Sequence, residues 1–242
     1  MGVDGIPFNA PASVERIMFL LARLQPAENA RILDVGCGRG AMLAMLAASA
    51  GIIGTGIDPD LAEITIARER PVTRGQLEFH CATFADVPID GILDVGFDAA
   101  LCIGATHAFG PPETALPCAL HVLRELVRTG GRLLIGEGYW RRPPEPAYLA
   151  ATGLTADELR THDDNIAAGK AAGLEPVHSE VSSAEEWDDF EDAFLRAAEH
   201  RHAEAPDDAD AAAALRHWQT WNAAYHRWGR ETMGFGFYIF EV

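Results

Sequence analysis

The residues with the clearest chemical potential lie in two short segments of the first quarter of the chain. The first is Leu33-Asp-Val-Gly-Cys-Gly-Arg-Gly40, where the carboxylate of Asp34 precedes three glycines at alternate positions. The second is Gly56-Ile-Asp58, where an acid ends an apolar run. Glycines let the backbone turn tightly and approach a ligand, because they carry no Cβ atom. An acid roughly 20 residues after the first glycine is suited to binding both hydroxyls of a ribose. The two segments therefore predict a site for a nucleoside-bearing cofactor.

Asp34 discriminates between two kinds of cofactor. Gly36, Gly38 and Ala41 satisfy the glycine pattern of dinucleotide-binding proteins. A pyrophosphate at this loop would be repelled by the Asp34 carboxylate, whereas a cationic sulfonium or ammonium group would be attracted. The acid two positions before the first glycine therefore favours a positively charged ligand.

The elements that must position these residues alternate between strand and helix. We expect strands at residues 32–35, 52–57, 77–80, 98–103 and 132–137. We expect helices at residues 13–24, 41–49, 59–70 and 113–128, the last ended by Gly130-Gly131. This alternation predicts right-handed crossovers and a mainly parallel sheet covered on both faces. Ligands of such sheets bind outside the carboxyl ends of the strands, where Asp34 and Asp58 are expected.

The two motifs, Leu33 to Gly40 and Gly56 to Asp58, strongly resemble the first two motifs of class I S-adenosylmethionine-dependent methyltransferases. The resemblance implies an α/β, Rossmann-like fold: a seven-stranded, mostly parallel sheet with an antiparallel last strand. Further along we expect strands at 175–181 and 235–242, and helix-like segments at 155–172, 184–203 and 209–230. We therefore expect one methyltransferase domain, residues 1–242. Residues 184–230 would form a helical cap or insertion between strands six and seven, able to roof the active site.

The resemblance also implies a set of residues that bind S-adenosylmethionine. Asp34 and the turn after it are expected beside the methionine part, and Asp58 at the ribose. Asp58 alternatively caps the helix that starts at Pro59, and the two roles are compatible. The family often has an acid and a small residue after the third strand, but this chain has Cys81-Ala82. Backbone at Ala82 and Thr83, with Phe84 against the adenine, is expected to serve instead. The complete expected set is Asp34, Gly36, Cys37, Gly38, Asp58, Pro59, Ala82, Thr83, Phe84 and Cys102.

Two further residues are candidates for catalysis. His107 follows the fourth strand, and its imidazole is suited to taking a proton from a hydroxyl, thiol or amine. The alternative is a loop histidine that only packs or hydrogen-bonds. Glu137 ends the fifth strand, where a buried carboxylate is costly unless it is paired or functional. It either pairs with Arg141 or binds a polar or cationic group of the acceptor.

The cysteines and tryptophans each allow two interpretations. Cys37, Cys81 and Cys102 are expected at neighbouring strand ends, as a thiol or metal site or, preferably, as small packing residues. No Asp-Asn pair or other metal-ligand cluster is apparent, so we expect metal-independent chemistry. All five tryptophans follow Glu137, among them Trp218 and Trp221 on one helical face. They either form core, which is favoured for each singly, or contact an apolar or cationic small molecule.

The charge balance limits the class of partner. The 242 residues carry a formal charge of −17 and one lysine, Lys170, which argues against nucleic acid. The acidic run at 185–210 indicates a solvated helical face. Residues 1–12 lack the basic and apolar regions of a secretory signal. The uncharged stretch 41–57 is interrupted by glycines and Ser49, so we do not expect a membrane span. We expect a cytoplasmic protein, monomer or homodimer, with a small-molecule substrate.

Methyl transfer from S-adenosylmethionine to a small molecule is therefore the leading hypothesis. One alternative is an NAD-dependent oxidoreductase, because the glycine pattern alone fits a dinucleotide. The other is a protein that binds S-adenosylmethionine without catalysis. The acceptor, and whether oxygen, nitrogen, sulfur or carbon is methylated, remain open at this point.

Overall fold

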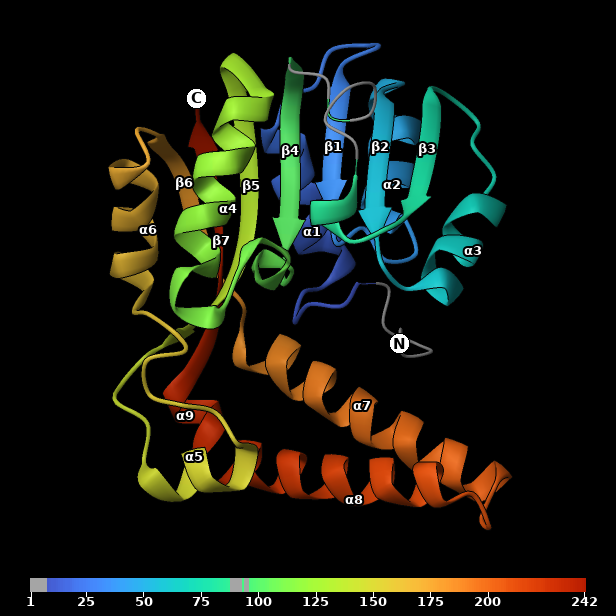
Figure 1. Ribbon diagram of the computed structural model, residues 1–242, viewed down its shortest axis with the longest axis vertical. Helices are drawn as coiled ribbons and strands as arrows, with labels where there is room; N and C mark the ends of the chain where they lie inside the picture. The colour runs from blue at the N-terminus through green and yellow to red at the C-terminus, as the bar shows by residue number, and fades with distance from the viewer. Residues whose placement is uncertain (1–7, 88–92, 94–95) are drawn as a thin grey trace.

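A seven-stranded sheet forms the centre of the computed structural model, which describes residues 8–87, 93 and 96–242 (Figure 1). The strands lie in the order β3-β2-β1-β4-β5-β7-β6. Strands β1 to β5 pair in parallel, whereas β7 runs antiparallel to both β5 and β6. The predicted mostly parallel sheet with an antiparallel last strand is thus confirmed. The strands are β1 (Arg31–Val35), β2 (Ile53–Asp58), β3 (Gln76–Cys81), β4 (Phe97–Ile103), β5 (Val127–Trp140), β6 (Glu175–Val181) and β7 (Met233–Glu241).

The strand order creates a switch point beside β1. The chain builds outward from β1 to β2 and β3, then returns to place β4 on the other side of β1. In register, Asp34 of β1 lies opposite Gly56 of β2 and Leu101 of β4. The crevice outside the carboxyl ends at such a point is where open α/β sheets bind ligands. The two sequence motifs therefore meet at this edge of the sheet.

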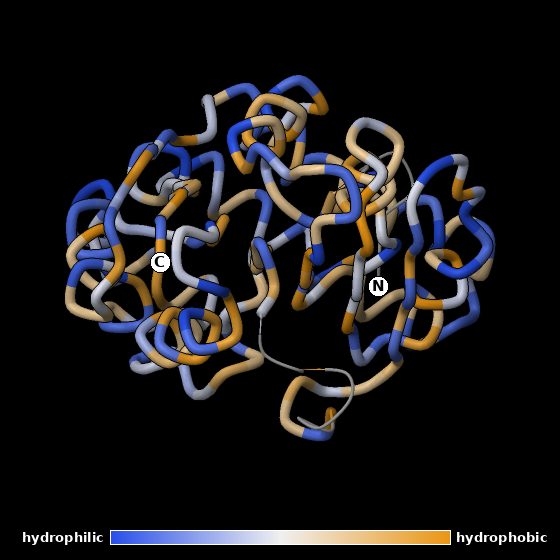
Figure 2. Tube along the Cα trace, turned by 90° about the horizontal axis from the view of Figure 1, so that it is seen from above, coloured by the Kyte–Doolittle hydropathy of each residue, from blue (hydrophilic) through white to orange (hydrophobic). Residues whose placement is uncertain are grey.

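Each face of the sheet is covered by helices and carries its own apolar core. Helix α1 is an example of a helix that packs with one apolar face: Ile17, Leu20 and Leu21 recur at helical spacing and are buried. The Ser13 side chain accepts from the Arg16 N–H and so caps the start of this helix. Figure 2 shows the same alternation of hydrophilic and hydrophobic residues around the peripheral helices. One core involves α1 (Val14–Arg23), α2 (Ala41–Ala50) and α3 (Leu61–Glu69), and the other α4 (Pro112–Leu126) and α6 (His162–Ala171).

Two predicted helix ends are wrong for identifiable reasons. The fourth helix ends at Leu126, because Val127 already pairs with Phe97 as the start of β5. The Gly130-Gly131 pair lies within β5 rather than ending a helix. A Cβ at Gly131 would lie 2.5 Å from the Val127 side chain and 2.7 Å from the main-chain oxygen of Asp98, so this bend requires glycine. Helix α3 starts at Leu61 and is capped by the side chain of Asp60, not by Asp58.

The segment between β5 and β6 also differs from expectation. Helix α5 (Pro146–Thr152) has no counterpart among the expected helices, and its Pro146 lies in the first turn, where proline is favoured. The predicted helix 155–172 is helical only from His162, where Thr161 caps it. The final helical segment, predicted at 209–230, is α8 (Ala209–Ala224), a π-helical turn (Tyr225–Gly229) and α9 (Arg230–Thr232).

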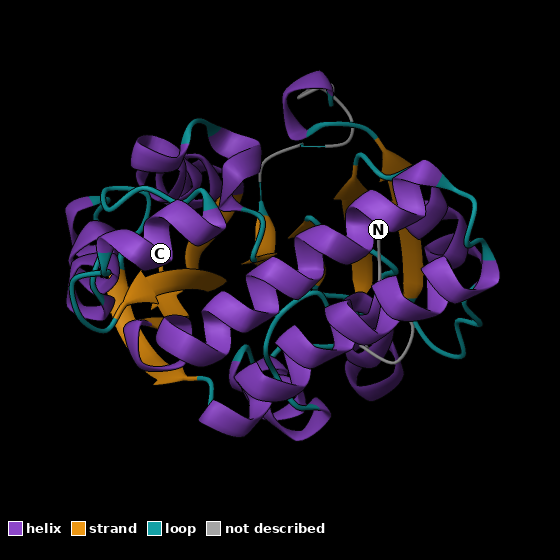
Figure 3. Ribbon diagram, turned by 90° about the horizontal axis from the view of Figure 1, so that it is seen from below, coloured by secondary structure: helices purple, strands orange, loops and turns teal. Residues whose placement is uncertain are grey.

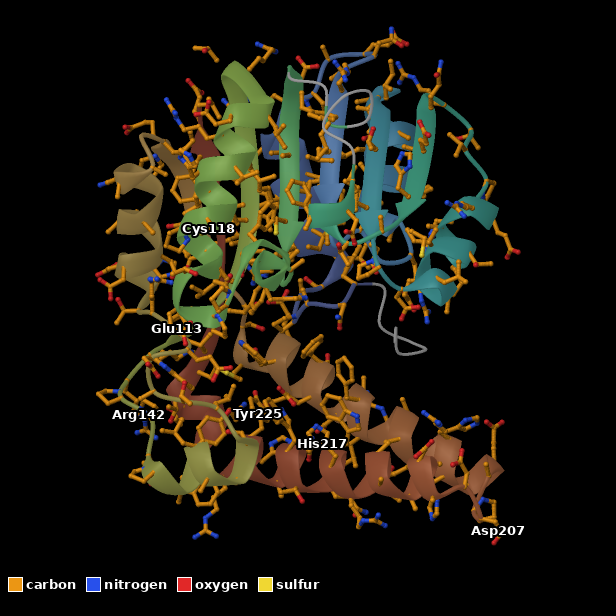
Figure 4. The ribbon with its side chains drawn as sticks, viewed as in Figure 1. Glu113, Cys118, Arg142, Asp207, His217 and Tyr225 are labelled. Carbon is orange, nitrogen blue, oxygen red and sulfur yellow. The ribbon has the colours of Figure 1, made fainter. Side chains whose placement is uncertain are left out.

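The expected helical insertion between β6 and β7 is present. Helices α7 (Ala184–Glu204) and α8 run side by side beyond the carboxyl ends of the parallel strands (Figures 1 and 3). Helix α5 packs against α8 and joins this layer. Rings fill its interior: Trp187 stacks on Tyr225 at 5.9 Å between centroids, and Phe194 on Trp218 at 4.5 Å. Tyr225 points inward from the end of α8, and its hydroxyl donates to Asp188 of α7 (Figure 4). The core interpretation therefore holds for Trp187 and for buried Trp140.

Glu186 fastens the insertion to the first helix. Its side chain accepts from the main-chain N–H groups of Ser13 and Ser183 and from the Ser13 hydroxyl. Both of its carboxylate oxygens also accept from the Arg16 Nε–H, at 2.9 Å for Oε1 and 2.8 Å for Oε2. Burial alone would raise the pKa of Glu186, but the hydrogen bonds from Arg16, Ser13 and Ser183 outweigh it and lower the pKa to about 2. One carboxylate thus caps α7 and ties it to the start of α1.

We predict that Glu186→Gln lowers the free energy of unfolding at neutral pH by roughly 1–3 kcal/mol, the range for hydrogen bonds to charged groups. The pKa of Glu186 is lower in the folded state. Its stabilisation is therefore complete above the unfolded value of about 4.3 and is lost as the pH falls through about 2. Urea unfolding should show that the difference in the free energy of unfolding between wild type and Glu186→Gln disappears as the pH falls over that interval. Exposed Glu15→Gln is the matched control, and an equal effect there would contradict the assignment.

Candidate functional site

A cavity of about 470 Å³ opens at the carboxyl ends of β1 to β4. Seven of the predicted donor-binding residues line it, as does His107. Its lining consists of Asn9, Val35, Gly36, Gly38, Ile57, Asp58, Pro59, Asp60, Glu63, Ala82, Thr83, Phe84, Ile103, Gly104, Ala105, His107 and Ala108. The two sequence motifs and the segments after β3 and β4 therefore converge on one space.

Asp58 is held in place by two main-chain groups. One carboxylate oxygen, Oδ2, accepts from the N–H of Gly38 at 2.9 Å, and the other, Oδ1, accepts from the N–H of Asp60 at 2.9 Å. The first contact joins the end of β2 to the glycine turn after β1, and the second braces the start of α3. An ionised carboxylate has about four lone-pair sites, so capacity remains for further donors. The geometry gives a rigid acceptor pair at the mouth of the cavity.

The three glycines of the first motif have different surroundings. Gly36 and Gly38 line the cavity and have φ of +76° and +49°, a region that favours glycine. A Cβ at Gly36 would lie 2.2 Å from the Ala105 Cβ, so this glycine lets the loop after β4 approach β1. Gly40 does not line the cavity, since it precedes α2 and packs beside the Phe79 ring. Only Gly38 combines the left-handed turn with open space beside it.

The predicted cysteines lie behind the cavity rather than in its lining. Cys37 and Cys102 are buried, and burial is the main cause that raises the pKa of both thiols, helped by nearby carboxylates. The thiols therefore stay protonated and pack as small, soft groups. Cys81 is exposed and its Sγ lies 3.6 Å from the main-chain oxygen of Pro59. Among the described residues, no three or more His, Cys, Asp or Glu side chains form a group that could hold a metal ion.

Phe84 and His107 both line the cavity, from the segments that follow β3 and β4. Phe84 packs on Phe109 with 4.5 Å between ring centroids, which fixes an aromatic wall beside Ala82 and Thr83. His107 is exposed, lies in a short 3₁₀ turn after β4, and also lines a second, smaller cavity of about 170 Å³. The two cavities share Gly104 and His107. His107 therefore borders both spaces.

Glu137 belongs to the second cavity and not to the first. It lies within β5, which continues to Trp140, rather than at a strand end. Of the two alternatives for Glu137, the pairing with Arg141 is not found: the Thr106 hydroxyl donates to Oε2 of Glu137, and the Arg141 main-chain N–H donates to the oxygen of Thr232. Burial raises the pKa of Glu137, while Thr106, the Gly138 N–H and the charge of Arg160 partly oppose that rise. Arg160 reaches this region because its segment pairs with β5 at Tyr139.

The chain is similar to known methyltransferases in sequence and in structure. A family described as a methyltransferase domain matches residues 32–131. The uncharacterized protein YjhP of Escherichia coli K12 is 32% identical over 232 residues, 93% of this chain and 90% of that protein. The crystal structure of a SAM-dependent methyltransferase from Thiobacillus denitrificans, in complex with S-adenosyl-L-homocysteine, superposes with a TM-score of 0.86. It is 26% identical, and the superposition covers 98% of this chain and 95% of that one.

The chain belongs to the S-adenosylmethionine-dependent methyltransferases. The family resemblance seen in the sequence is therefore confirmed, together with the fold. The O-methyltransferase cnsE of Penicillium expansum is 36% identical over 118 residues, but that match covers 48% of this chain and 40% of cnsE. In the described part of the chain, no helix has the length and apolar character needed to cross a membrane.

Sequence reasoning missed several lining residues of this methyltransferase. Ile57 and Ile103 are final or near-final strand residues, so the rule that ligands bind at strand tips would have found them. Glu63 lies on the first turn of α3, one turn after the acidic tip of β2. Asn9 gave no signal, because its place in the lining depends on how the segment before α1 packs.

Carboxylates dominate the cavity of the methyltransferase. Asp58, Asp60 and Glu63 line it, and no arginine or lysine does so among the described residues, although Arg39 pairs with Glu63 at 3.0 Å from outside the lining. Asp34, expected to face the donor, is buried beneath the lining with 4% of its surface exposed. Burial, and then the charge of Asp58, raise the pKa of Asp34 to about 7. The field in the cavity therefore favours a cation over a phosphate.

We predict that Asp34→Asn stabilises the free protein increasingly as the pH rises from about 4 to about 7. The pKa of Asp34 is higher in the folded state. Its contribution to stability is therefore complete below the unfolded value of about 3.9 and is lost as the pH rises through about 7. The difference in urea midpoint between variant and wild type reports this. For exposed Asp157→Asn, the difference in urea midpoint should not change with pH. A difference that is also constant with pH for Asp34→Asn would disprove the raised pKa of Asp34.

Proposed function

We propose that this methyltransferase moves the sulfonium methyl group of S-adenosylmethionine to a small-molecule acceptor, with the donor in the larger cavity. The observation that carries the proposal is the cavity at the switch point, lined by three carboxylates and, among its described residues, by no cationic side chain. Such a lining attracts the positive charge of the donor and disfavours the pyrophosphate of NAD. The donor when bound supplies an activated methyl group.

The chain's own residues bind and orient that donor. Asp58 has free lone pairs for the two ribose hydroxyls, and Gly38 leaves space for close approach of the ligand. We assign the adenine to the wall formed by Ala82, Thr83 and Phe84. Asp34 contributes charge from beneath the lining, while Cys37 and Cys102 support it by packing. Gly36 and Pro59 complete the donor set through their place in the lining.

On the acceptor side, His107 occupies the border between the two cavities. In the transfer, a lone pair of the acceptor bonds to the methyl carbon and the carbon–sulfur bond breaks, leaving its electrons on sulfur. The proton that the acceptor loses passes to His107 or to solvent. Glu137 orients the acceptor from the second cavity. Alignment and exclusion of water do most of the work in such a displacement.

The helical insertion completes the proposal. We treat residues 1–242 as one catalytic domain in which residues 184–230 act as a cap over the strand ends. The side-by-side arrangement of α7 and α8 beyond those ends supports this role (Figure 3). A charge of −17 supports a small molecule rather than nucleic acid as partner. Four free cysteines fit a reducing cytoplasm, where we expect a monomer or homodimer.

Calorimetric titration tests the choice of donor directly. We expect S-adenosylhomocysteine and S-adenosylmethionine to bind with similar stoichiometry, and NAD to show no measurable binding, because the cavity opposes a pyrophosphate. Turnover is then followed as S-adenosylhomocysteine release across a panel of small hydroxyl, amine and thiol compounds. Tight binding of NAD alone would overturn the proposal. Donor binding without turnover on any acceptor would favour a binding protein instead.

We predict that Asp58→Ala weakens binding of S-adenosylhomocysteine by roughly 100-fold, the loss expected when two hydrogen bonds to a charged acceptor are removed. Asp58 also fastens Gly38 and Asp60, so thermal unfolding must verify that the variant remains folded. Asp58→Asn retains one acceptor oxygen, so its affinity for S-adenosylhomocysteine should lie between those of wild type and Asp58→Ala. Exposed Asp157→Ala serves as control. Unchanged affinity in folded Asp58→Ala would show that the ribose binds elsewhere.

A further inference from the structure

The second cavity is a distinct space with its own polar lining. It has a volume of about 170 Å³ and lies between β5, the start of α4 and the segment that precedes α6. This is several times the ~30 Å³ that one water molecule occupies in the liquid, so a group of a few heavy atoms fits. The polar or charged side chains in its lining are Thr106, His107, Glu137, Glu158, Arg160 and Asn165. Its contact with the donor cavity at Gly104 and His107 makes it the place for part of the acceptor.

Asn165 supplies an unsatisfied hydrogen-bond acceptor in this lining. Its side chain is 2% exposed, and its Nδ2 donates to the main-chain oxygen of Gly138 at 3.3 Å and to the Tyr238 hydroxyl at 3.1 Å. The Gly138 oxygen can only accept, which fixes which end of the amide faces it. The buried Oδ1 of Asn165 then has no hydrogen-bond partner among the described residues. Because such an atom is costly to bury alone, it marks a position for a donor group.

Tyr238 and His162 hold the side-chain amide of Asn165 in this orientation. The Tyr238 hydroxyl lies 3.0 Å from Nδ1 of His162 on the same helix as Asn165. Burial lowers the pKa of His162, so its ring is neutral and can accept from Tyr238. The hydroxyl is then free to accept from Nδ2 of Asn165. This chain of bonds holds Asn165 with Oδ1 as its only spare polar atom.

Glu137 supplies the charge. Its Oε2 accepts from the Thr106 hydroxyl, and among the described residues its Oε1 accepts only from the adjacent Gly138 N–H at 3.2 Å. Neither donor carries a charge that would neutralise the carboxylate. Arg160, the cation in this lining, donates to the main-chain oxygen of Glu113, at the start of α4 (Figure 4). With Glu158 also in the lining, carboxylates outnumber the guanidinium.

We propose that the second cavity binds a primary ammonium group of the methyl acceptor, held between the Glu137 carboxylate and Oδ1 of Asn165. An ammonium group has three donors and a positive charge, which match two acceptors and a carboxylate whose charge the nearby Arg160 offsets only in part. A neutral hydroxyl leaves the buried charge in place, and a carboxylate group is repelled by it. The inference rests on the proposed methyl transfer. It narrows the acceptors to amines whose ammonium-bearing end is small enough for the second cavity. The ammonium group acts as the anchor, with the rest of the acceptor extending past His107.

Paired probes of nearly equal shape test this proposal. Protein saturated with S-adenosylhomocysteine is titrated with propylammonium or with 1-propanol, and binding is followed by NMR through the Asn165 side-chain amide. We expect propylammonium to bind about tenfold more tightly, since charge-assisted hydrogen bonds exceed neutral ones by about that factor. Glu137→Gln keeps the size and the Thr106 contact but should abolish the preference. Glu113→Gln makes the same charge change at an exposed neighbour outside the lining and should preserve it.

The possible results separate this inference from the proposed function. Equal affinity for the two probes, no binding of propylammonium, or a preference that survives in Glu137→Gln would each overturn the ammonium site while donor binding stands. Failure of wild-type protein to bind S-adenosylhomocysteine would instead overturn the proposed function. Binding of S-adenosylhomocysteine and thermal unfolding, measured on each variant, show whether Glu137→Gln acts on the second cavity alone. If Glu137→Gln does not fold, the comparison of propylammonium with 1-propanol on wild-type protein still decides the proposal.

Discussion

The carboxylate of Asp58 is the contact on which the arrangement of the larger cavity depends. It receives main-chain N–H groups from Gly38 and Asp60, which belong to the loop after β1 and the start of α3. Main-chain hydrogen bonds from Gly36 and Cys37 to the oxygen of Ile57, and the ion pair of Arg39 with Glu63, strengthen the same connection. The register of β1 with β2 brings both strand ends level, and the carboxylate then locks the turns above them. The Asp58 carboxylate thereby fixes part of the cavity lining and also provides a hydrogen-bond acceptor for the main-chain N–H groups of both loops.

The helical layer beyond the strand ends is held in place by long-range connections. The chain leaves the sheet after β6, forms α7 and α8, and returns as β7 between β5 and β6. The helical layer is therefore anchored to the sheet at both of its ends, and Glu186 adds a third attachment through Ser13 and Arg16 on α1. Three attachments limit how far the layer can tilt relative to the sheet.

Sequence patterns predicted those features that depend on neighbouring residues. Strands β1 and β6 were placed within one residue, because apolar or alternating runs there end at glycine or polar residues. The partner of Glu137 was not predictable, since the Thr106 loop meets β5 only after the sheet has formed. Asn165 gave no signal either, as an asparagine within a polar helix is normally solvated. The burial of Asp34 follows from its place in the central strand, which the strand order, not the motif, determines.

The distribution of tryptophan has an optical consequence. All five indoles lie after β4, at Trp140, Trp187, Trp218, Trp221 and Trp228, and none lines either described cavity. Strands β1 to β4 and the helices between them therefore contain no strongly fluorescent side chain. Intrinsic tryptophan fluorescence of this protein reports the packing of the helical layer and the adjoining end of β5. The part of the molecule from β1 to β4 contributes no tryptophan signal. The native chain thus carries its own spectroscopic label on one side only.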